Sequence, residues 1–142
     1  MRTRLSAYST CFNTNLTLVP FVENLFSTFS GIDTELVMVD NYSTDGTWET
    51  LRVLQEKYNI HLYREKSNRG RGRKIAFEKT DGDYTLSVDA DNVFIDNTYK
   101  IILNDHINLL DNNSIVNFTL SKRDIIAMAG NWNVDLNAAE DV

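Results

Sequence analysis

The chain has 142 residues, of which 42% are hydrophobic and 24% are charged, a composition typical of one globular domain that covers residues 1–142. This composition excludes a disordered tail, a collagen-like repeat and a disulfide scaffold. The formal net charge of −6 argues against a nucleic-acid-binding protein, which needs an overall basic face. The longest unbroken aliphatic run covers residues 36–39, so we expect no transmembrane segment.

Apolar runs and helical spacings alternate along the chain. The apolar runs predict strands over residues 5–11, 35–40, 60–64, 84–89 and 115–120. The helical spacings predict helices over residues 16–29, 48–58, 73–79, 97–110 and 122–129. In the first of these helices, Leu16, Val19 and Val22 form part of the expected apolar face, and Pro20 is expected in the first turn. Strands that alternate with helices predict an α/β fold, with a parallel sheet flanked by helices on both faces.

Two of the predicted strands end in a carboxylate, Asp40 and Asp89. In a parallel sheet of this kind, ligands bind in the crevice at the carboxyl ends of the strands. We therefore expect both side chains to point into a crevice rather than into the core.

The segment Asp89-Ala90-Asp91 follows an apolar strand directly. Two carboxylates two residues apart can share a hard divalent cation such as Mg²⁺ or Mn²⁺, and the small Ala90 lets a ligand approach the backbone. For an isolated D-x-D, the plainer interpretation of an acidic turn in water is favoured. An EF-hand is excluded because its central glycine and final glutamate are missing, and no P-loop motif is present.

A basic segment lies within this acidic chain. Arg69, Arg71, Arg73 and Lys74 place four cations in six residues, and residues 67–72 are expected to form a loop. Three interpretations stay open in the order in which they are favoured: a solvated loop that pairs with nearby carboxylates, a phosphate clamp, and an RNA-binding arginine-glycine segment.

Taken together, five segments resemble motifs of family 2 glycosyltransferases, in the same order along the chain. They are residues 39–47 (VDNYSTDGT), 68–76 (NRGRGRKIA), 81–84 (DGDY), 89–91 (DAD), and 130–132 (GNW) with the pair Glu140-Asp141. The resemblance covers about residues 5–142 and implies the GT-A fold, a nucleotide-binding α/β domain.

The same resemblance implies roles for individual residues. Asp91 resembles the main metal ligand, Asp89 a residue that contacts the ribose or the metal shell, and Asp141 the catalytic base. The remaining candidates for nucleotide-sugar binding are Thr10, Asn13, Asp40, Asn41, Arg69, Arg73 and Ala90.

The implied activity is an inverting, metal-assisted hexosyltransferase reaction. The donor would be a UDP- or GDP-linked sugar, the cofactor Mn²⁺ or Mg²⁺, and the acceptor a glycan hydroxyl or a lipid-linked phosphate. Family members usually continue beyond the position of Asp141, so we expect this chain to lack acceptor-side elements. The single cysteine fits a reducing compartment, and we expect a cytoplasmic location, peripheral at the membrane face if the acceptor is a lipid.

Two alternatives remain at this point. A nucleotidyltransferase would carry a glycine-rich loop after the first strand, where residues 10–13 read TCFN. A non-catalytic nucleotide-sugar binding module would keep the donor site without transfer.

Overall fold

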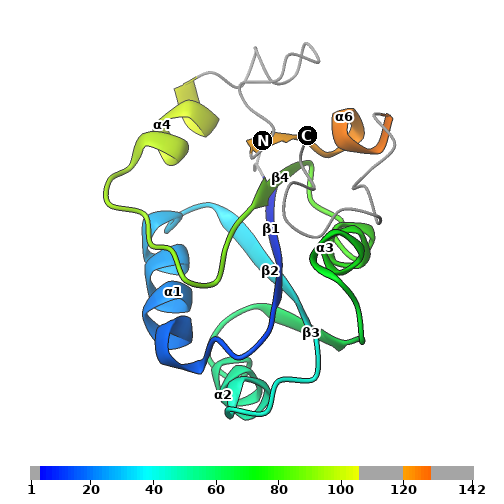
Figure 1. Ribbon diagram of the computed structural model, residues 1–142. Helices are drawn as coiled ribbons and strands as arrows, with labels where there is room; N and C mark the ends of the chain where they lie inside the picture. The colour runs from blue at the N-terminus through cyan, green and yellow to red at the C-terminus, as the bar shows by residue number, and fades with distance from the viewer. Residues whose placement is uncertain (1–3, 106–119, 129–142) are drawn as a thin grey trace.

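The computed structural model describes residues 4–105 and 120–128, which form a five-stranded sheet covered by helices (Figure 1). The strands are β1 (Arg4–Cys11), β2 (Asp33–Asp40), β3 (Ile60–Arg64), β4 (Tyr84–Ser87) and β5 (Leu120–Lys122). The helices are α1 (Asn15–Thr28), α2 (Thr47–Leu54), α3 (Arg69–Glu78), α4 (Thr98–Asp105) and α6 (Arg123–Met128). The α/β fold class predicted from the sequence is therefore confirmed.

The strand order in the sheet is β3-β2-β1-β4-β5. β1 pairs in parallel with β2 and β4, and β2 pairs in parallel with β3, whereas β5 runs antiparallel to β4. The register places Cys11 beside Asp40, so β1 and β2 end at the same edge. The loops that follow β1, β2, β3 and β4 consequently meet at this carboxyl edge of the sheet.

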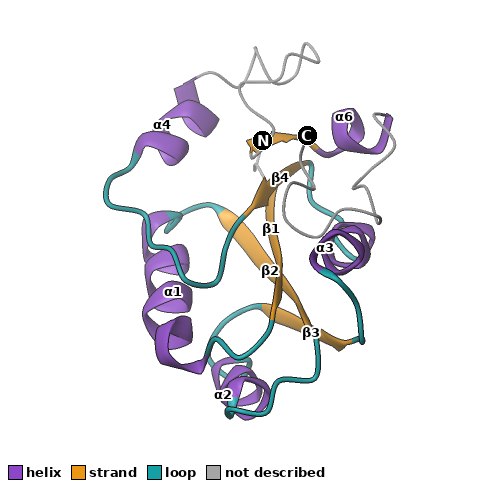
Figure 2. Ribbon diagram, in the orientation of Figure 1, coloured by secondary structure: helices purple, strands orange, loops and turns teal. Residues whose placement is uncertain are grey.

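Helices cover the sheet on two sides, as Figure 2 shows. One core lies between the sheet and the helices α1, α2 and α4, and it contains Leu5, Ala7 and Met38 from the strands. The other core lies beneath α3 and α6 and contains Tyr8 and Val37. Neighbouring residues of one strand thus face opposite cores, because side chains alternate along a strand.

The predicted apolar face of the first helix is wrong in part. The buried residues of α1 are Leu18, Phe21, Val22, Leu25 and Thr28. Leu16 is 96% exposed and Val19 is 38% exposed. Both sets follow helical spacing, so spacing alone did not decide which set packs on the sheet. Pro20 lies in the second turn rather than the first.

The third helix begins earlier than predicted. α3 starts at Arg69, so Gly70, Arg71 and Gly72 are helical and not part of a loop. The reason is the cap: the Oδ1 atom of Asn68 accepts a hydrogen bond from the backbone N–H of Arg71 at 2.7 Å. Two other elements are shorter than predicted, since α2 ends at Leu54 and β4 ends at Ser87. Residues 106–119 of the predicted fourth helix and fifth strand lie outside the described residues.

Candidate functional site

A cavity of about 520 Å³ opens at the carboxyl edge of the sheet. Its walls come from the segments that follow β1, β2, β3 and β4. Seven of the residues that the sequence marked as candidates line it together: Thr10, Asn41, Arg69, Arg73, Asp89, Ala90 and Asp91. The fold therefore gathers at one place residues from Thr10 to Asp91, which are 81 positions apart in the chain.

Arg73 lies on the buried side of α3 and reaches the turn after β4. Its Nη2 atom forms an ion pair with Oδ1 of Asp89, and its Nη1 atom donates a hydrogen bond to the Ser87 hydroxyl at 2.6 Å. The Arg73 side chain is 9% exposed, whereas that of Asp89 is 54% exposed. The buried guanidinium thus holds the carboxylate of Asp89, the first of the D-x-D segment, in place at the cavity wall.

The acidic turn itself is well anchored. The Ala90 carbonyl accepts a hydrogen bond from the Thr17 hydroxyl at 3.0 Å, which ties the turn to α1. The Asn92 backbone N–H donates to the Asp89 carbonyl at 3.1 Å. Asp91 is exposed and lines the cavity. The turn therefore presents two carboxylates on a backbone that is held at both sides.

The chemistry of these donors fits one kind of cation. Within residues 4–105 and 120–128, no three His, Cys, Asp or Glu side chains come together to hold a metal. One oxygen of Asp89 is also engaged by Arg73. Two carboxylates suit Mg²⁺ or Mn²⁺, since these ions take oxygen ligands and complete their shells with water and phosphate oxygens. The residues fit such an ion and do not fit a site built from protein ligands alone.

Asp40 does not face the crevice as expected. It is 0% exposed, and four protein groups donate to its carboxylate. Ser43 contributes its hydroxyl at 2.5 Å and its backbone N–H at 3.2 Å, Arg64 its Nε at 3.2 Å, and Cys11 its thiol at 3.6 Å. Burial, followed by the charge of Asp40, raises the pKa of the Cys11 thiol far above its usual range, so the thiol keeps its proton. Asp40 thereby holds the turn after β2 in place.

Asn13 lies beside the cavity rather than in its wall. Its Oδ1 atom accepts a hydrogen bond from the Thr44 backbone N–H at 2.8 Å, and its own N–H donates to the Ser43 hydroxyl at 2.8 Å. Asn41, which does line the cavity, accepts from the Ser67 N–H at 3.1 Å. These bonds join the loops after β1, β2 and β3 into one rim.

The floor of the cavity is formed where α3 lies close to β1. Thr10 donates from its hydroxyl to the Val39 carbonyl at 3.1 Å and lies against Gly72 of α3. A Cβ atom at Gly72 would come within 2.8 Å of the Thr10 Cβ. Glycine at this position therefore allows α3 to bring Arg69 and Arg73 to the cavity.

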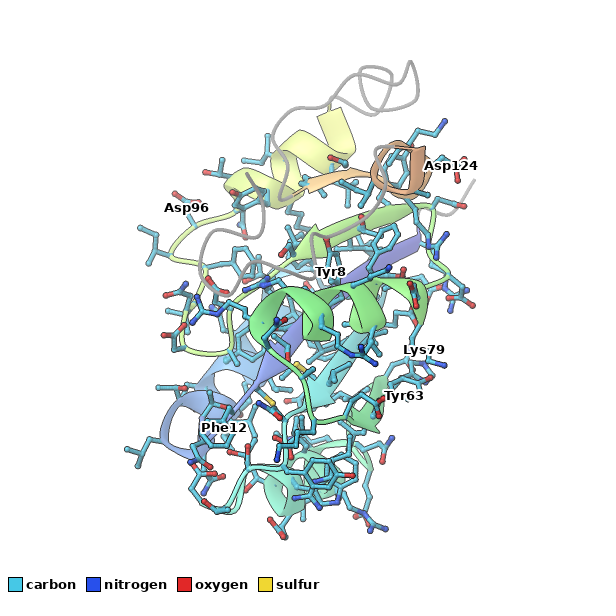
Figure 3. The ribbon with its side chains drawn as sticks, turned by 45° about the vertical axis from the view of Figure 1, so that its right-hand side comes forward. Tyr8, Phe12, Tyr63, Lys79, Asp96 and Asp124 are labelled. Carbon is cyan, nitrogen blue, oxygen red and sulfur yellow. The ribbon has the colours of Figure 1, made fainter. Side chains whose placement is uncertain are left out.

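Several lining residues were not singled out from the sequence. They are Cys11, Phe12, Thr14, Ser67, Asn68 and Asn92. Phe12 is the most prominent, because this large aromatic residue is 55% exposed directly after β1 (Figure 3). A large aromatic residue directly after a strand, at the edge where ligands bind, is the signal that could have identified it. The predicted base, Asp141, lies outside the described residues, as do residues 130–132.

The fold is of the GT-A type, and solved structures superpose on nearly the whole chain. TarS 1-349 from S. aureus superposes with a TM-score of 0.76 at 17% identity, over 98% of this chain and 53% of that one. The mannosyltransferase PcManGT from Pyrobaculum calidifontis, in complex with GDP-Man and Mn²⁺, superposes with a TM-score of 0.75 at 20% identity, over 99% of this chain and 50% of that one.

The family follows from the sequence match. Residues 6–133 match the family model described as glycosyl transferase family 2, and the chain belongs to this family. This membership decides against the nucleotidyltransferase alternative.

Two curated relatives are dolichol-phosphate mannosyltransferases. The protein from Mycosarcoma maydis is 35% identical over 89 residues, which are 56% of this chain and 30% of that protein. The protein from Pyrococcus furiosus is 33% identical over 76 residues, which are 49% of this chain and 22% of that protein. The matched part thus covers less than a third of these relatives. Within the described part of the chain, no helix combines the length and apolar character needed to cross a membrane.

Proposed function

We propose that the chain binds a nucleoside diphosphate sugar in the cavity at the carboxyl edge and transfers the sugar to an acceptor. The observation that carries this proposal is the gathering of Asn41, Arg69 and the Asp89–Asp91 turn around one opening of about 520 Å³. An opening of this size suits a nucleotide. The residues that line it carry cationic, amide and carboxylate groups, which are the groups that bind phosphates, ribose hydroxyls and a divalent ion.

In this proposal the two ends of the donor lie at different walls. The diphosphate lies between the acidic turn and Arg69 of α3, and the nucleoside lies toward Phe12 and Asn41. Thr10 forms the floor between them. Asp40 and Asn13 act on the nucleotide through the loops that they hold, because their oxygens already accept hydrogen bonds from the protein.

A divalent cation belongs to the proposed site. Asp91 would hold Mn²⁺ or Mg²⁺, with Asp89 beside it. When bound, the ion would neutralise negative charge on the diphosphate leaving group. Arg73 keeps Asp89 at the wall and contributes a fixed positive charge of its own.

The acceptor side of the proposal rests on the family resemblance. Asp141 is proposed to take the proton of an acceptor hydroxyl as its oxygen attacks the anomeric carbon, which inverts the anomer in one displacement. The donor is proposed to be UDP- or GDP-linked, and the acceptor to be a glycan hydroxyl or a lipid phosphate. The names of the two curated relatives support the lipid phosphate, and with it a location at the membrane face.

Calorimetric titration of the full chain with UDP and GDP, with and without Mn²⁺, tests the proposal. We expect binding that strengthens with Mn²⁺. Asp91→Asn should weaken it by at least about tenfold in the presence of the metal, since even changes that only support metal ligands commonly cost this much. Asp124→Asn is the matched control because it removes the same charge from an exposed site on α6, which contributes none of the cavity-lining residues and lies away from Phe12 (Figure 3). The proposal fails if neither nucleotide binds, or if Asp91→Asn matches the control.

A further inference from the structure

A second hollow adjoins the cavity on its proposed nucleoside side. It has a volume of about 540 Å³ and is lined by Phe12, Asn41, Tyr42 and Lys66. Phe12 and Asn41 also line the first cavity, so the two spaces border the same two side chains. Phe12 is 55% exposed and Tyr42 is 53% exposed. Two aromatic rings thus stand at one opening without being needed to fill the core.

The backbone of Tyr42 is in an unusual conformation. Its φ angle is +52°, in the left-handed region that is unfavourable for a residue with a Cβ atom and that glycine adopts freely. The neighbouring turn residue Gly46 also has a positive φ, and there the chain does use glycine. Residue 42 is nevertheless a tyrosine, although its half-exposed ring contributes little burial energy to the stability of the fold. Backbone strain of this kind clusters at functional sites, which points to a function of the side chain.

The Tyr42 ring is also supported from behind. The Arg64 Cζ atom lies 4.9 Å from the centre of the Tyr42 ring and 4.8 Å from that of the Trp48 ring. Arg64 is fixed in turn by its ion pair with the buried Asp40 and by a hydrogen bond from Nη2 to the Ser43 carbonyl at 3.3 Å. Arg64 is not one of the residues that line the hollow. The ring is therefore held in one orientation before a ligand arrives, which lowers the entropy lost on binding.

We infer that Tyr42 is a nucleobase-binding residue, whose ring stacks on the base of the donor and is oriented by Arg64 and Trp48. The ligand class is the flat heterocycle of a nucleoside diphosphate, and the inference rests on the proposed function. Lys66 and Asn41 line the same hollow, and their side chains carry N–H groups that can donate to a base carbonyl oxygen. Asp40 gains a second role here, because it anchors the arginine that backs the ring.

Three substitutions of Tyr42 separate stacking from folding. Tyr42→Phe keeps the ring, Tyr42→Gly removes both ring and strain, and Tyr42→Asn removes the ring but tolerates the left-handed backbone. We expect Tyr42→Phe to bind GDP and UDP like the wild type. Tyr42→Gly and Tyr42→Asn should bind both nucleotides roughly 5- to 150-fold more weakly, the range measured for loss of one base–aromatic stack. Their melting temperatures should equal or exceed that of the wild type.

Inorganic pyrophosphate, titrated with Mg²⁺, serves as the ligand without a base. Its affinity should be unchanged in all three variants. Arg64→Lys keeps the charge near Asp40 but lacks the planar guanidinium, so it should weaken nucleotide binding less than Tyr42→Gly does. When Arg64→Lys is combined with Tyr42→Gly, it should add no further loss of nucleotide affinity. The inference is overturned if the wild type binds nucleotides and Tyr42→Gly binds them equally well, or if pyrophosphate binding falls in parallel. A wild type that binds neither nucleotide would instead refute the proposed function.

Discussion

At the scale of single residues, the pair Arg73–Asp89 shows how the site is prepared for a charged ligand. Arg73 belongs to the basic segment, for which a solvated loop was the favoured interpretation. The structure places its guanidinium in the interior, where it bonds to Ser87 and Asp89. A buried cation that already has a carboxylate partner positions that partner more than it attracts a distant anion. Arg69, by contrast, is exposed and lines the cavity wall, where its side chain faces solvent rather than the interior.

Loss of the Arg73 guanidinium should destabilise the protein measurably. We expect Arg73→Gln to lower the free energy of unfolding by about 1–2 kcal/mol, because the Ser87 hydroxyl loses its donor while solvent screens the half-exposed Asp89. Urea denaturation measures the change. In a double-mutant cycle with Ser87→Ala, the two losses should not add, since both remove the same hydrogen bond. Fully additive losses would show that the bond contributes nothing.

At the scale of elements, one carboxylate joins the start of α1 to the start of α2. Asp45 accepts from the Thr47 hydroxyl at 2.5 Å and from the Thr47 N–H at 3.0 Å with one oxygen, and from the Asn15 N–H at 3.0 Å with the other. The hydrogen bond from the Thr47 hydroxyl, with the two backbone N–H groups adding to it, lowers the pKa of Asp45 below its usual range. The D-G-T motif therefore fixes the rim of the cavity by satisfying free helix ends.

The pH dependence of stability should reveal this carboxylate. A depressed pKa means that the ionised Asp45 stabilises the fold above its unfolded pKa, and that this contribution is lost as the pH falls through the lower folded value. We expect Asp45→Asn to melt at a lower temperature than the wild type at pH 7, and the difference to shrink on acidification. Glu56→Gln, which neutralises another exposed carboxylate, is the control. A difference that stays constant down to pH 2 would contradict the assignment.

At the scale of the whole molecule, the two ends of the sheet have different roles, one in the site and the other in stability. The carboxyl edge holds the cavity, while the amino edge is closed by the buried Glu35. Glu35 accepts from the Ser6 hydroxyl and from the Asp81 N–H at 3.2 Å, and its Oε1 atom lies 3.3 Å from His61 Nε2. This cluster connects β1, β2 and β3 with the turn before β4. It supports the fold without contributing to the site.

A substitution at the amino edge should therefore separate stability from ligand binding. Glu35→Gln keeps the shape but turns an acceptor oxygen into a donor, and we expect it to cost about 1–3 kcal/mol of unfolding free energy. Nucleotide affinity, measured calorimetrically at a temperature where both proteins are folded, should be unchanged. A loss of affinity that parallels the loss of stability would show that the two ends of the sheet are coupled.

Within residues 4–105 and 120–128, the sequence by itself determined the order of strands and helices, and it also indicated the α/β class and the family. These properties depend on local signals, namely apolar runs, helical spacing and short motifs such as D-x-D and D-G-T. The same signals indicated that Asn41 and the Asp89–Asp91 turn follow strands and meet at one edge, because parallel strands bring their carboxyl ends together.

Only the tertiary structure decided which side chains face that edge. It buried Asp40, exposed Leu16, began α3 at Arg69 and directed Arg73 to Asp89. Apart from the start of α3, which its neighbouring cap Asn68 sets, these outcomes depend on partners that are distant in the chain, as for Asn24, which bonds to the backbone of Phe94 seventy positions away. Local patterns record which residues are apolar or charged. The packing of helices on the sheet decides which of them become core, support or cavity wall, because only packing fixes what each side chain can reach.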